Sequence, residues 1–291
     1  MATTVHALLP AKQPIRLKQI GQQIAFSIVV VLITGITIFP LYWMLLTAIQ
    51  PNDVNVAYPP RFWPEAIDLT SFVEVFGDFP LAAWIMHSAL IACLATALAL
   101  LLSVLGAYPL SCLRWRGRSA FGFFLFFTQM MPEAMIVIPI FIIYRHLHLT
   151  ESLPGLALVD SAFVIPVGVW ILKNVFDGVP SEVREAALVD GCGVFSVLWR
   201  IVLPLSGPGM VAVAVVAFFY AWNDYLFAST MITMQEIRPA SSGLAGFITM
   251  GVVPIERILA GGLIFALPPA IFYLLTQRHL VTGLTAGAVK G

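Results

Sequence analysis

Five polar or aromatic side chains lie inside stretches that are otherwise apolar, where they could bind a solute. They are Glu133, Asp160, Trp222, Asn223 and Asp224. A charged side chain at the centre of a bilayer costs roughly 2.5–3.5 kcal/mol on insertion scales, so such groups usually serve a function. A polar solute in such a stretch needs hydrogen-bond partners together with apolar surface. These residues are therefore candidates for a substrate path; alternatively, they form hydrogen bonds between helices and hold a bundle together.

A second group of residues lies in the charged, amphipathic stretch from Pro180 to Pro208. Ser181 can cap the first turn of a helix, and Gly191 with Gly193 suits a sharp turn after it. On this first helix, helical spacing predicts one shared face for Val183, Ala186 and Ala187. A second helix is predicted with an apolar stripe of Val194, Val197, Leu198, Ile201 and Val202. The stretch is expected to form two short helices joined by a glycine turn.

The chemistry of this stretch suits a mechanical joint with another protein. Ala186 and Ala187 allow close approach of a second surface, as small residues do at helix contacts. Arg184 and Glu185 offer charges that orient a partner. The apolar stripe of the second helix can pack on a membrane core and pass on a displacement. The alternative is an ordinary amphipathic helix lying on the membrane surface.

Residues typical of catalysis or metal binding do not cluster in the sequence. The five histidines are scattered, and Cys93, Cys112 and Cys192 lack metal or redox spacing. No G-x-x-x-x-G-K-[ST] pattern occurs, so the chain has no P-loop for ATP hydrolysis. With 60% hydrophobic and 10% charged residues the chain is not an ordinary soluble domain, and its zero net charge gives no indication of nucleic-acid binding. We expect a membrane protein that is not an enzyme and holds no metal.

Continuous apolar runs predict six membrane-spanning helices. They lie near residues 24–49, 84–110, 120–144, 154–175, 207–231 and 258–280. The first run is too long for the core of a cleaved signal peptide, so it is expected to be a retained helix. These helices must position both groups of residues described above.

The distribution of Lys and Arg predicts the orientation of the spans. One side carries eleven of these residues, namely Lys12, Arg16, Lys18, Arg114, Arg116, Arg118, Lys173, Arg184, Arg200, Arg278 and Lys290. The other side carries four, namely Arg61, Arg145, Arg238 and Arg257. Since positive residues accumulate on the cytoplasmic side, both termini and the 180–208 stretch are expected there.

The 180–208 stretch resembles the cytoplasmic EAA loop of permease subunits in bacterial ABC importers. The matching residues are Glu185, Ala186, Ala187, Gly191, Ile201, Leu203 and Pro204. The ending Gly283–Gly291, the run Ala221–Asp224 and the spacing from Pro132 to Pro139 resemble sugar permeases of the MalG kind. One departure is His87-Ser88, where relatives tend to have Asn-Ser, so the role of that position is open.

The resemblance implies an all-α membrane protein with the type I ABC importer permease fold, working as half of a translocation pathway for a sugar. It implies coupling to a separate ATPase through Glu185, Ala186, Ala187, Asp190, Gly191, Ile201, Leu203 and Pro204. The implied partners are a second related permease, two ATPase subunits that bind ATP and Mg, and an extracytoplasmic substrate-binding protein. The expected location is the cytoplasmic (inner) membrane of a bacterium or archaeon.

The expected organisation is a single polytopic domain over residues 1–291. It consists of a cytoplasmic segment at 1–23, a permease core at about 84–280, a coupling loop at 176–206 and a C-terminal tail at 281–291. Two alternatives stay open. The cargo could be a polyamine, an amino acid or a glycerol-phosphate-type ester. An ion-coupled secondary transporter is the other, although the repeats and paired broken helices typical of that class are not detectable.

Overall fold

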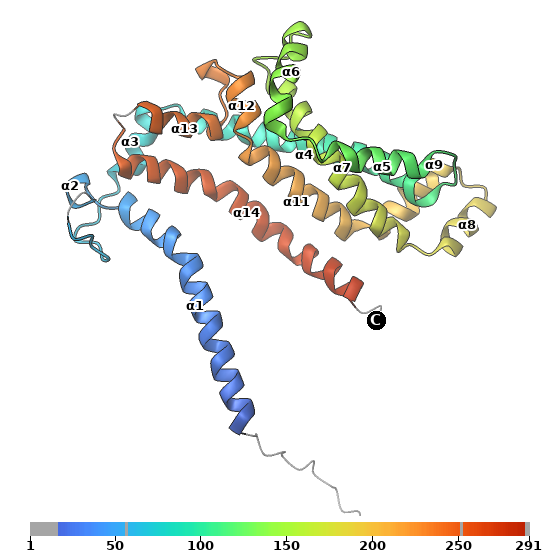
Figure 1. Cartoon of the computed structure of the whole chain (residues 1–291), viewed down its shortest axis with the longest axis horizontal. Helices are drawn as coiled ribbons and strands as arrows, with labels where there is room; N and C mark the ends of the chain where they lie inside the picture. The colour runs from blue at the N-terminus through green and yellow to red at the C-terminus, as the bar shows by residue number, and fades with distance from the viewer. Residues whose placement is uncertain (1–16, 56–57, 251–252, 289–291) are drawn as a thin grey trace, which may run out of the picture.

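The computed structural model describes residues 17–55, 58–250 and 253–288, and all regular structure in these ranges is helical (Figure 1). Four single helices are long and apolar enough to cross a membrane. They are α1 (Leu17–Ala48), α4 (Leu81–Cys112), α7 (Leu153–Asp177) and α14 (Ile255–Ala288). The predicted spans at 84–110, 154–175 and 258–280 fall within these helices, and the one at 24–49 extends one residue beyond α1.

Two further candidate spans are bent helix pairs. One pair is α5 (Arg118–Thr128) with α6 (Glu133–His146), bent by 99°. The other joins the segment Val194–Leu205 to α11 (Gly207–Asn223), bent by 83°. The described chain thus has four candidate spans, or six when each bent pair counts as one.

Shorter helices connect these elements. They are α2 (Asn52–Asn55), α3 (Thr70–Asp78), α8 (Ser181–Val189), α9 (Val194–Val197), the π-helix η1 (Leu198–Val202), α10 (Leu203–Leu205), α12 (Leu226–Met231), the 3-10 helix η2 (Gln235–Ile237) and α13 (Ala240–Met250).

Helices α4, α7 and α11 form the centre of the bundle, and small residues let them approach closely. On α4, Ala92, Ala95 and Ala99 are fully or almost fully buried. A Cβ atom on Gly168 of α7 would lie 2.3 Å from the Ser103 hydroxyl oxygen of α4. A Cβ atom on Gly209 of α11 would lie 2.6 Å from a methyl carbon of Val175. The three helices are therefore packed more closely than larger residues would allow.

Helix α1 stands apart from this centre and contacts α14 (Figure 1). Among residues 22–48 of this helix, only the last three, Leu46, Thr47 and Ala48, are buried, and most of the apolar stretch is exposed. Helix α14 lies between α1 and α11 and continues to Ala288. The predicted tail at 281–291 is thus helical as far as Ala288; residues 289–291, like residues 1–16 of the predicted N-terminal segment, lie outside the described residues.

Two predicted spans are interrupted, and in both cases the backbone explains the break. The expectation of one continuous helix over 120–144 is wrong, because α5 ends at Thr128 and α6 begins at Glu133. Pro132 before α6 has an extended backbone (ψ 129°) and no N–H to donate. The expected helix over 207–231 ends at Asn223, because Asp224 is also extended (ψ 123°). The chain then continues as the short helix α12.

Candidate functional site

The two interrupted spans meet at a hydrogen bond between their polar residues. The Tyr220 hydroxyl on α11 donates to a carboxylate oxygen of Glu133 at 2.8 Å. Glu133 is the first residue of α6, where the helix dipole favours a negative charge. Tyr220 also packs against Phe163 of α7, with 6.2 Å between ring centroids. The predicted candidate Glu133 is therefore held half-buried at the junction of α6, α7 and α11.

Asp160 on α7 lies close enough to this junction to interact electrostatically with Glu133 and Asp224. Its side chain is completely buried, and neither carboxylate oxygen has a hydrogen-bond partner among the described residues. A buried polar group without a partner is costly. The structure thus brings together three of the five predicted candidates, and Asp160 is the one whose hydrogen-bonding capacity is unused within the described chain.

Asp224 has a structural function of its own. Its two carboxylate oxygens accept hydrogen bonds from the backbone N–H groups of Phe227 and Ala228, at 3.2 and 2.8 Å. These N–H groups belong to the first turn of α12, where no helical partner exists for them. The carboxylate therefore starts α12 immediately after the break in the fifth predicted span.

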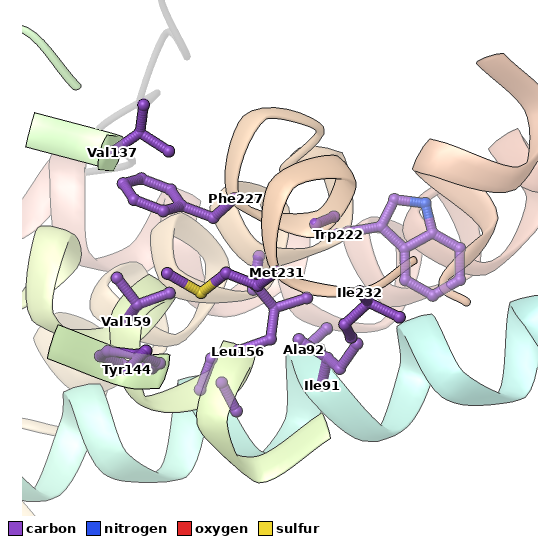
Figure 2. Packing of buried hydrophobic residues seen from close by; sticks show 14 of the residues in the cluster. Ile91, Ala92, Val137, Tyr144, Leu156, Val159, Trp222, Phe227, Met231 and Ile232 are labelled. Atoms are coloured by element: carbon purple, nitrogen blue, oxygen red, sulfur yellow. The ribbon is translucent and has the colours of Figure 1, made fainter. Parts of the chain in front are cut away.

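Trp222 and Asn223 differ in burial and in the contacts of their side chains. The Trp222 ring is completely buried and stacks on Phe218 and on Phe265 of α14, with centroids 5.7 and 5.3 Å apart. Figure 2 shows this ring projecting away from Val137 and Val159 at the far side of the same apolar cluster. Asn223 is exposed, and its amide donates to the Phe219 carbonyl oxygen at 2.8 Å. Trp222 is a packing residue in this structure, whereas Asn223 remains accessible.

Gln129 and Tyr220 belong to the polar junction but were not among the predicted site residues. The Gln129 amide donates to the Phe163 carbonyl oxygen at 2.9 Å, beside the break between α5 and α6. Tyr220 precedes Asp224 by one helical turn. Polar side chains within a turn of an interruption are the signal that could have identified them.

The second predicted site, residues 181–204, is here named the coupling segment. Its first helix, α8, ends in a Schellman motif. Gly191 has φ +86°, and its N–H donates to the Leu188 carbonyl oxygen at 3.1 Å. The next N–H, of Cys192, donates to the Ala187 carbonyl oxygen at 2.9 Å. The predicted glycine turn therefore occurs at Gly191. Gly193 has an ordinary φ of −71°.

The three residues predicted to share one face of α8 differ in burial: Ala187 is buried, whereas Ala186 and Val183 are exposed. Glu185, Asp190 and Gly191 are exposed as well. The predicted cap is wrong, because Ser181 is the first residue of α8 and the preceding Pro180 provides no side-chain cap. Ala187 anchors α8 inward and leaves Glu185 and Ala186 accessible to a partner.

The second half of the coupling segment is embedded in the bundle. Val197, Leu198 and Val202 are almost completely buried, as predicted for the apolar stripe, and they pack with residues of α4 and α7. Val194, predicted for the same stripe, is exposed. Leu203 is buried, Ile201 is half-buried and Pro204 is exposed. The Tyr108 hydroxyl on α4 donates to the Val194 carbonyl oxygen at 3.0 Å. A displacement of α8 therefore acts directly on helices of the central bundle.

A polar hollow of about 450 Å³ lies beside α8. Its charged lining residues are Arg114, Arg118, Arg184 and Glu185. Two guanidinium nitrogens of Arg184, Nε and Nη1, are buried without a hydrogen-bond partner in the described chain. The hollow is thus positively charged and offers unused donors next to the accessible residues of α8.

The opposite end of α4 is tied to the chain between η2 and α13. Trp84 Nε1 donates to the Gln235 carbonyl oxygen at 3.3 Å, and His87 Nδ1 lies 3.1 Å from the Arg238 carbonyl oxygen. The Ser88 hydroxyl oxygen accepts from the Ala240 N–H at 2.9 Å. The His87-Ser88 pair, whose role was open, thus holds the segment that leads into α13.

Glu151 fastens a neighbouring loop through its carboxylate. The carboxylate accepts hydrogen bonds from the Thr233 hydroxyl at 2.5 Å and from the N–H groups of Thr233 and Met234. Burial alone raises the pKa of Glu151. These hydrogen bonds and the charge of Arg238 outweigh it and lower the pKa below its ordinary value. The contact therefore depends on an ionised carboxylate.

Comparisons with known proteins agree with this architecture. The family model for the binding-protein-dependent transport system inner membrane component matches residues 99–284. The chain is 32% identical to the inner membrane ABC transporter permease protein YcjP of Escherichia coli, covering 94% of this chain and 99% of that protein. It is 29% identical to the trehalose/maltose transport system permease protein MalG of Thermococcus litoralis, with the same coverage of 94% and 99%.

A solved structure matches the fold over almost its whole length. It is a chain of a bacterial ABC transporter involved in the import of the acidic polysaccharide alginate. The TM-score is 0.77 at 21% sequence identity, and the match covers 92% of this chain and 99% of that chain. At this identity the likeness shows a shared fold.

Proposed function

Because this chain belongs to the family of binding-protein-dependent transport system inner membrane components, we propose that it imports a sugar as the permease subunit of an ABC importer. The family is a multi-pass membrane component of ABC transporters and not an enzyme. The proposal of a sugar cargo rests on the trehalose/maltose permease as a relative, together with the MalG-like ending and the Trp222–Asp224 region. In this proposal the chain forms half of the translocation pathway.

The coupling segment is the observation that carries the proposal. Helix α8 exposes Glu185 and Ala186, while Ala187 and the following apolar stripe connect it to α4 and α7. A partner that docks on α8 moves it as a rigid body, since the Schellman motif at Gly191 fixes its end. The central helices then reorient and expose the substrate path to the opposite side of the membrane.

The proposed partners follow from the importer architecture. A second related permease supplies the other half of the pathway, and an extracytoplasmic binding protein delivers the cargo. Two ATPase subunits dock on the coupling segments and bind the ATP and Mg, so this chain needs no cofactor of its own. Both termini and the coupling segment face the cytoplasm in this arrangement, as the distribution of Lys and Arg predicts.

The proposed substrate path runs past the hydrogen bond between Tyr220 and Glu133 and past Asn223, at the interruptions before α6 and after α11. Glu133 and Asn223 offer hydrogen-bond acceptors and donors, and the aromatic rings around them offer apolar surface to a sugar. Asp160 and Asp224 support this junction from the buried side. Asp224 also accepts hydrogen bonds from the first turn of α12, and these bonds hold the chain in position directly after Asn223.

The test is ATP-dependent uptake in proteoliposomes containing the assembly purified through a tag on this chain. Mono- and disaccharides are screened with the native binding protein. Gly191→Pro is expected to abolish uptake while the subunits still co-purify, because proline cannot adopt φ +86° or donate the hydrogen bond to Leu188. Gly193→Ala is the matched control, since Gly193 has an ordinary φ and open space around it.

The outcomes separate the parts of the proposal. Sugar uptake that requires ATP and is lost only in Gly191→Pro supports it. An assembly that takes up a polyamine, an amino acid or a phosphate ester but no sugar retains the importer and overturns the cargo. Uptake that follows an ion gradient, without a co-purifying ATPase, contradicts the whole proposal.

A further inference from the structure

A long groove follows α5 and α7 on the outside of the bundle. It consists of two adjoining hollows, of about 730 and 570 Å³, which share Phe126 and Trp170 as lining residues. Helix α5 has 11 residues, so the groove is about 16 Å long at 1.5 Å per residue. That length is about half of the roughly 30 Å hydrocarbon thickness of a bilayer, the depth of one leaflet.

One end of the groove is cationic. Arg118 and Lys173 line it at the end nearest the coupling segment, and Arg118 also lines the hollow beside α8. Lys173 is paired with Asp177 at 2.5 Å, and the Ser111 hydroxyl donates to the same carboxylate at 2.6 Å. Arg118 forms no hydrogen bond or ion pair with any residue in the described ranges, although its charge is felt by Asp177. Lys173 and Asp177 balance each other, so Arg118 leaves one net positive charge at this end of the groove.

The rest of the groove is apolar and open. Phe123 and Phe126 are 69% and 57% exposed, and Val167 and Ile171 continue the lining on α7. Gly122 also lines the groove, and a Cβ atom there would be in van der Waals contact with the Trp170 ring, at 3.6 Å. The indole N–H of Trp170 is buried without a hydrogen-bond partner in the described chain.

We propose that this groove binds one anionic phospholipid. The headgroup phosphate pairs with Arg118 and Lys173, and an acyl chain lies along Phe123, Phe126 and Ile171. Basic pockets between membrane helices bind anionic headgroups in this way. A soluble phosphate would not use the apolar length of the groove, and an apolar helix of another subunit would not satisfy the free charge of Arg118. The inference concerns a site outside the substrate path and does not depend on the cargo.

The test is native mass spectrometry of the detergent-solubilised assembly, titrated with phosphatidylglycerol or phosphatidylcholine of identical acyl chains. The wild type is expected to bind phosphatidylglycerol more tightly. Arg118→Gln weakens that binding about fivefold, the factor for about 1 kcal/mol per cation near an anionic headgroup, and leaves phosphatidylcholine unchanged. Arg116→Gln is the matched control, because Arg116 is exposed and lines neither hollow of the groove.

A second variant and a cross-link identify the occupant. Gly122→Leu fills the groove and is expected to reduce binding of phosphatidylglycerol even though both cations are retained. Inorganic phosphate should compete only weakly; strong competition would assign the site to a free anion and overturn the proposal. Equal retention of the two lipids by the wild type would also overturn it. So would a high-yield cross-link from Phe123→Cys to the second permease, because that subunit would then fill the groove.

Discussion

Tyr220 is the residue that joins the two interrupted spans. Its hydroxyl donates to Glu133 across the gap between α11 and α6, and its ring packs on Phe163 of α7. Glu133 would otherwise be a half-buried carboxylate in an apolar region, which is costly. A single hydrogen bond therefore fixes the relative position of two bent elements at the proposed substrate path.

Replacing Tyr220 by Phe is expected to lower the free energy of unfolding by about 1 kcal/mol, the typical value of one hydrogen bond. The measurement is thermal unfolding of the purified assembly. Tyr225→Phe is the control, because Tyr225 is 53% exposed and its hydroxyl has no hydrogen-bond partner in the described chain. Equal stability of both variants would show that the Tyr220–Glu133 bond does not hold the junction.

Glu151 gives a pH-dependent contact at the loop beside α12. Its pKa is lowered in the folded state, so the contact stabilises the protein fully above the ordinary value of 4.5. The stabilisation is lost as the pH falls through the lowered folded-state pKa, since a protonated carboxyl accepts the hydrogen bonds of Thr233 and Met234 less well.

Glu151→Gln is therefore expected to reduce thermal stability at pH 7 and to differ less from the wild type near pH 4. The comparison of unfolding temperatures at the two pH values isolates this residue from other titrating groups. Glu236→Gln, at an exposed position in η2, controls for the loss of one negative charge. If the unfolding temperatures of the wild type and Glu151→Gln differed by the same amount at both pH values, the contact would not depend on an ionised carboxylate.

At the scale of elements, close packing at glycine decides how α13 lies on α4. Gly243 faces the Trp84 ring so closely that a Cβ atom would lie 2.4 Å from it. Trp84 is itself 2% exposed and bonded to the Gln235 carbonyl oxygen, so it cannot move aside easily. The contact belongs to an apolar cluster with Val75, Leu81 and Phe247. This cluster connects α3, α4 and α13.

Gly243→Ala is expected to destabilise the assembly by about 1–3 kcal/mol, the usual cost of overpacking a well-filled core. Gly246→Ala, on the same helix, should be tolerated, because the nearest atom to its added Cβ would be 4.0 Å away. Thermal unfolding of both variants checks the difference. If Gly246→Ala lost stability and Gly243→Ala did not, the close contact between Gly243 and Trp84 would be contradicted.

At the scale of the whole molecule, the coupling segment and the segment before α13 contact opposite ends of α4. The coupling segment packs near Tyr108 and Leu172, whereas Trp84 and Ser88 hold the segment before α13 at the other end of α4. The polar junction lies between them, near Asp160. A rigid displacement at one end can therefore change the junction, because α4 and α7 run continuously past it.

The orientation of this arrangement can be tested with impermeant thiol reagents. In a background with Cys93, Cys112 and Cys192 replaced by Ser, Glu182→Cys on α8 should react only after right-side-out vesicles are permeabilised. Glu65→Cys, at an exposed position in the loop between α2 and α3, should react without permeabilisation. The opposite pattern would contradict the cytoplasmic location predicted from eleven cationic residues against four.

The sequence by itself determined the features that depend on local composition and conformation. Apolar runs located the four long helices and parts of both bent pairs, because a span needs only enough consecutive hydrophobic residues to cross the bilayer. The turn at Gly191 was predictable, since glycine alone adopts a positive φ without strain. The buried stripe of Val197, Leu198 and Val202 followed from helical spacing.

Only the tertiary structure decided which partner each of these residues meets. Asp160 and Asp224 look alike in the sequence, yet Asp224 caps α12 and Asp160 has no partner in the described chain. Ala186 and Ala187 are neighbours, yet one faces outward and the other packs on the core. The breaks before Glu133 and after Asn223 were missed because each lies inside a longer stretch that is apolar enough overall to be predicted as one span. The hydrogen-bond partner of a side chain, the face that it occupies and the bend of a helix depend on residues distant in the chain. A local sequence pattern does not specify which of these residues come into contact.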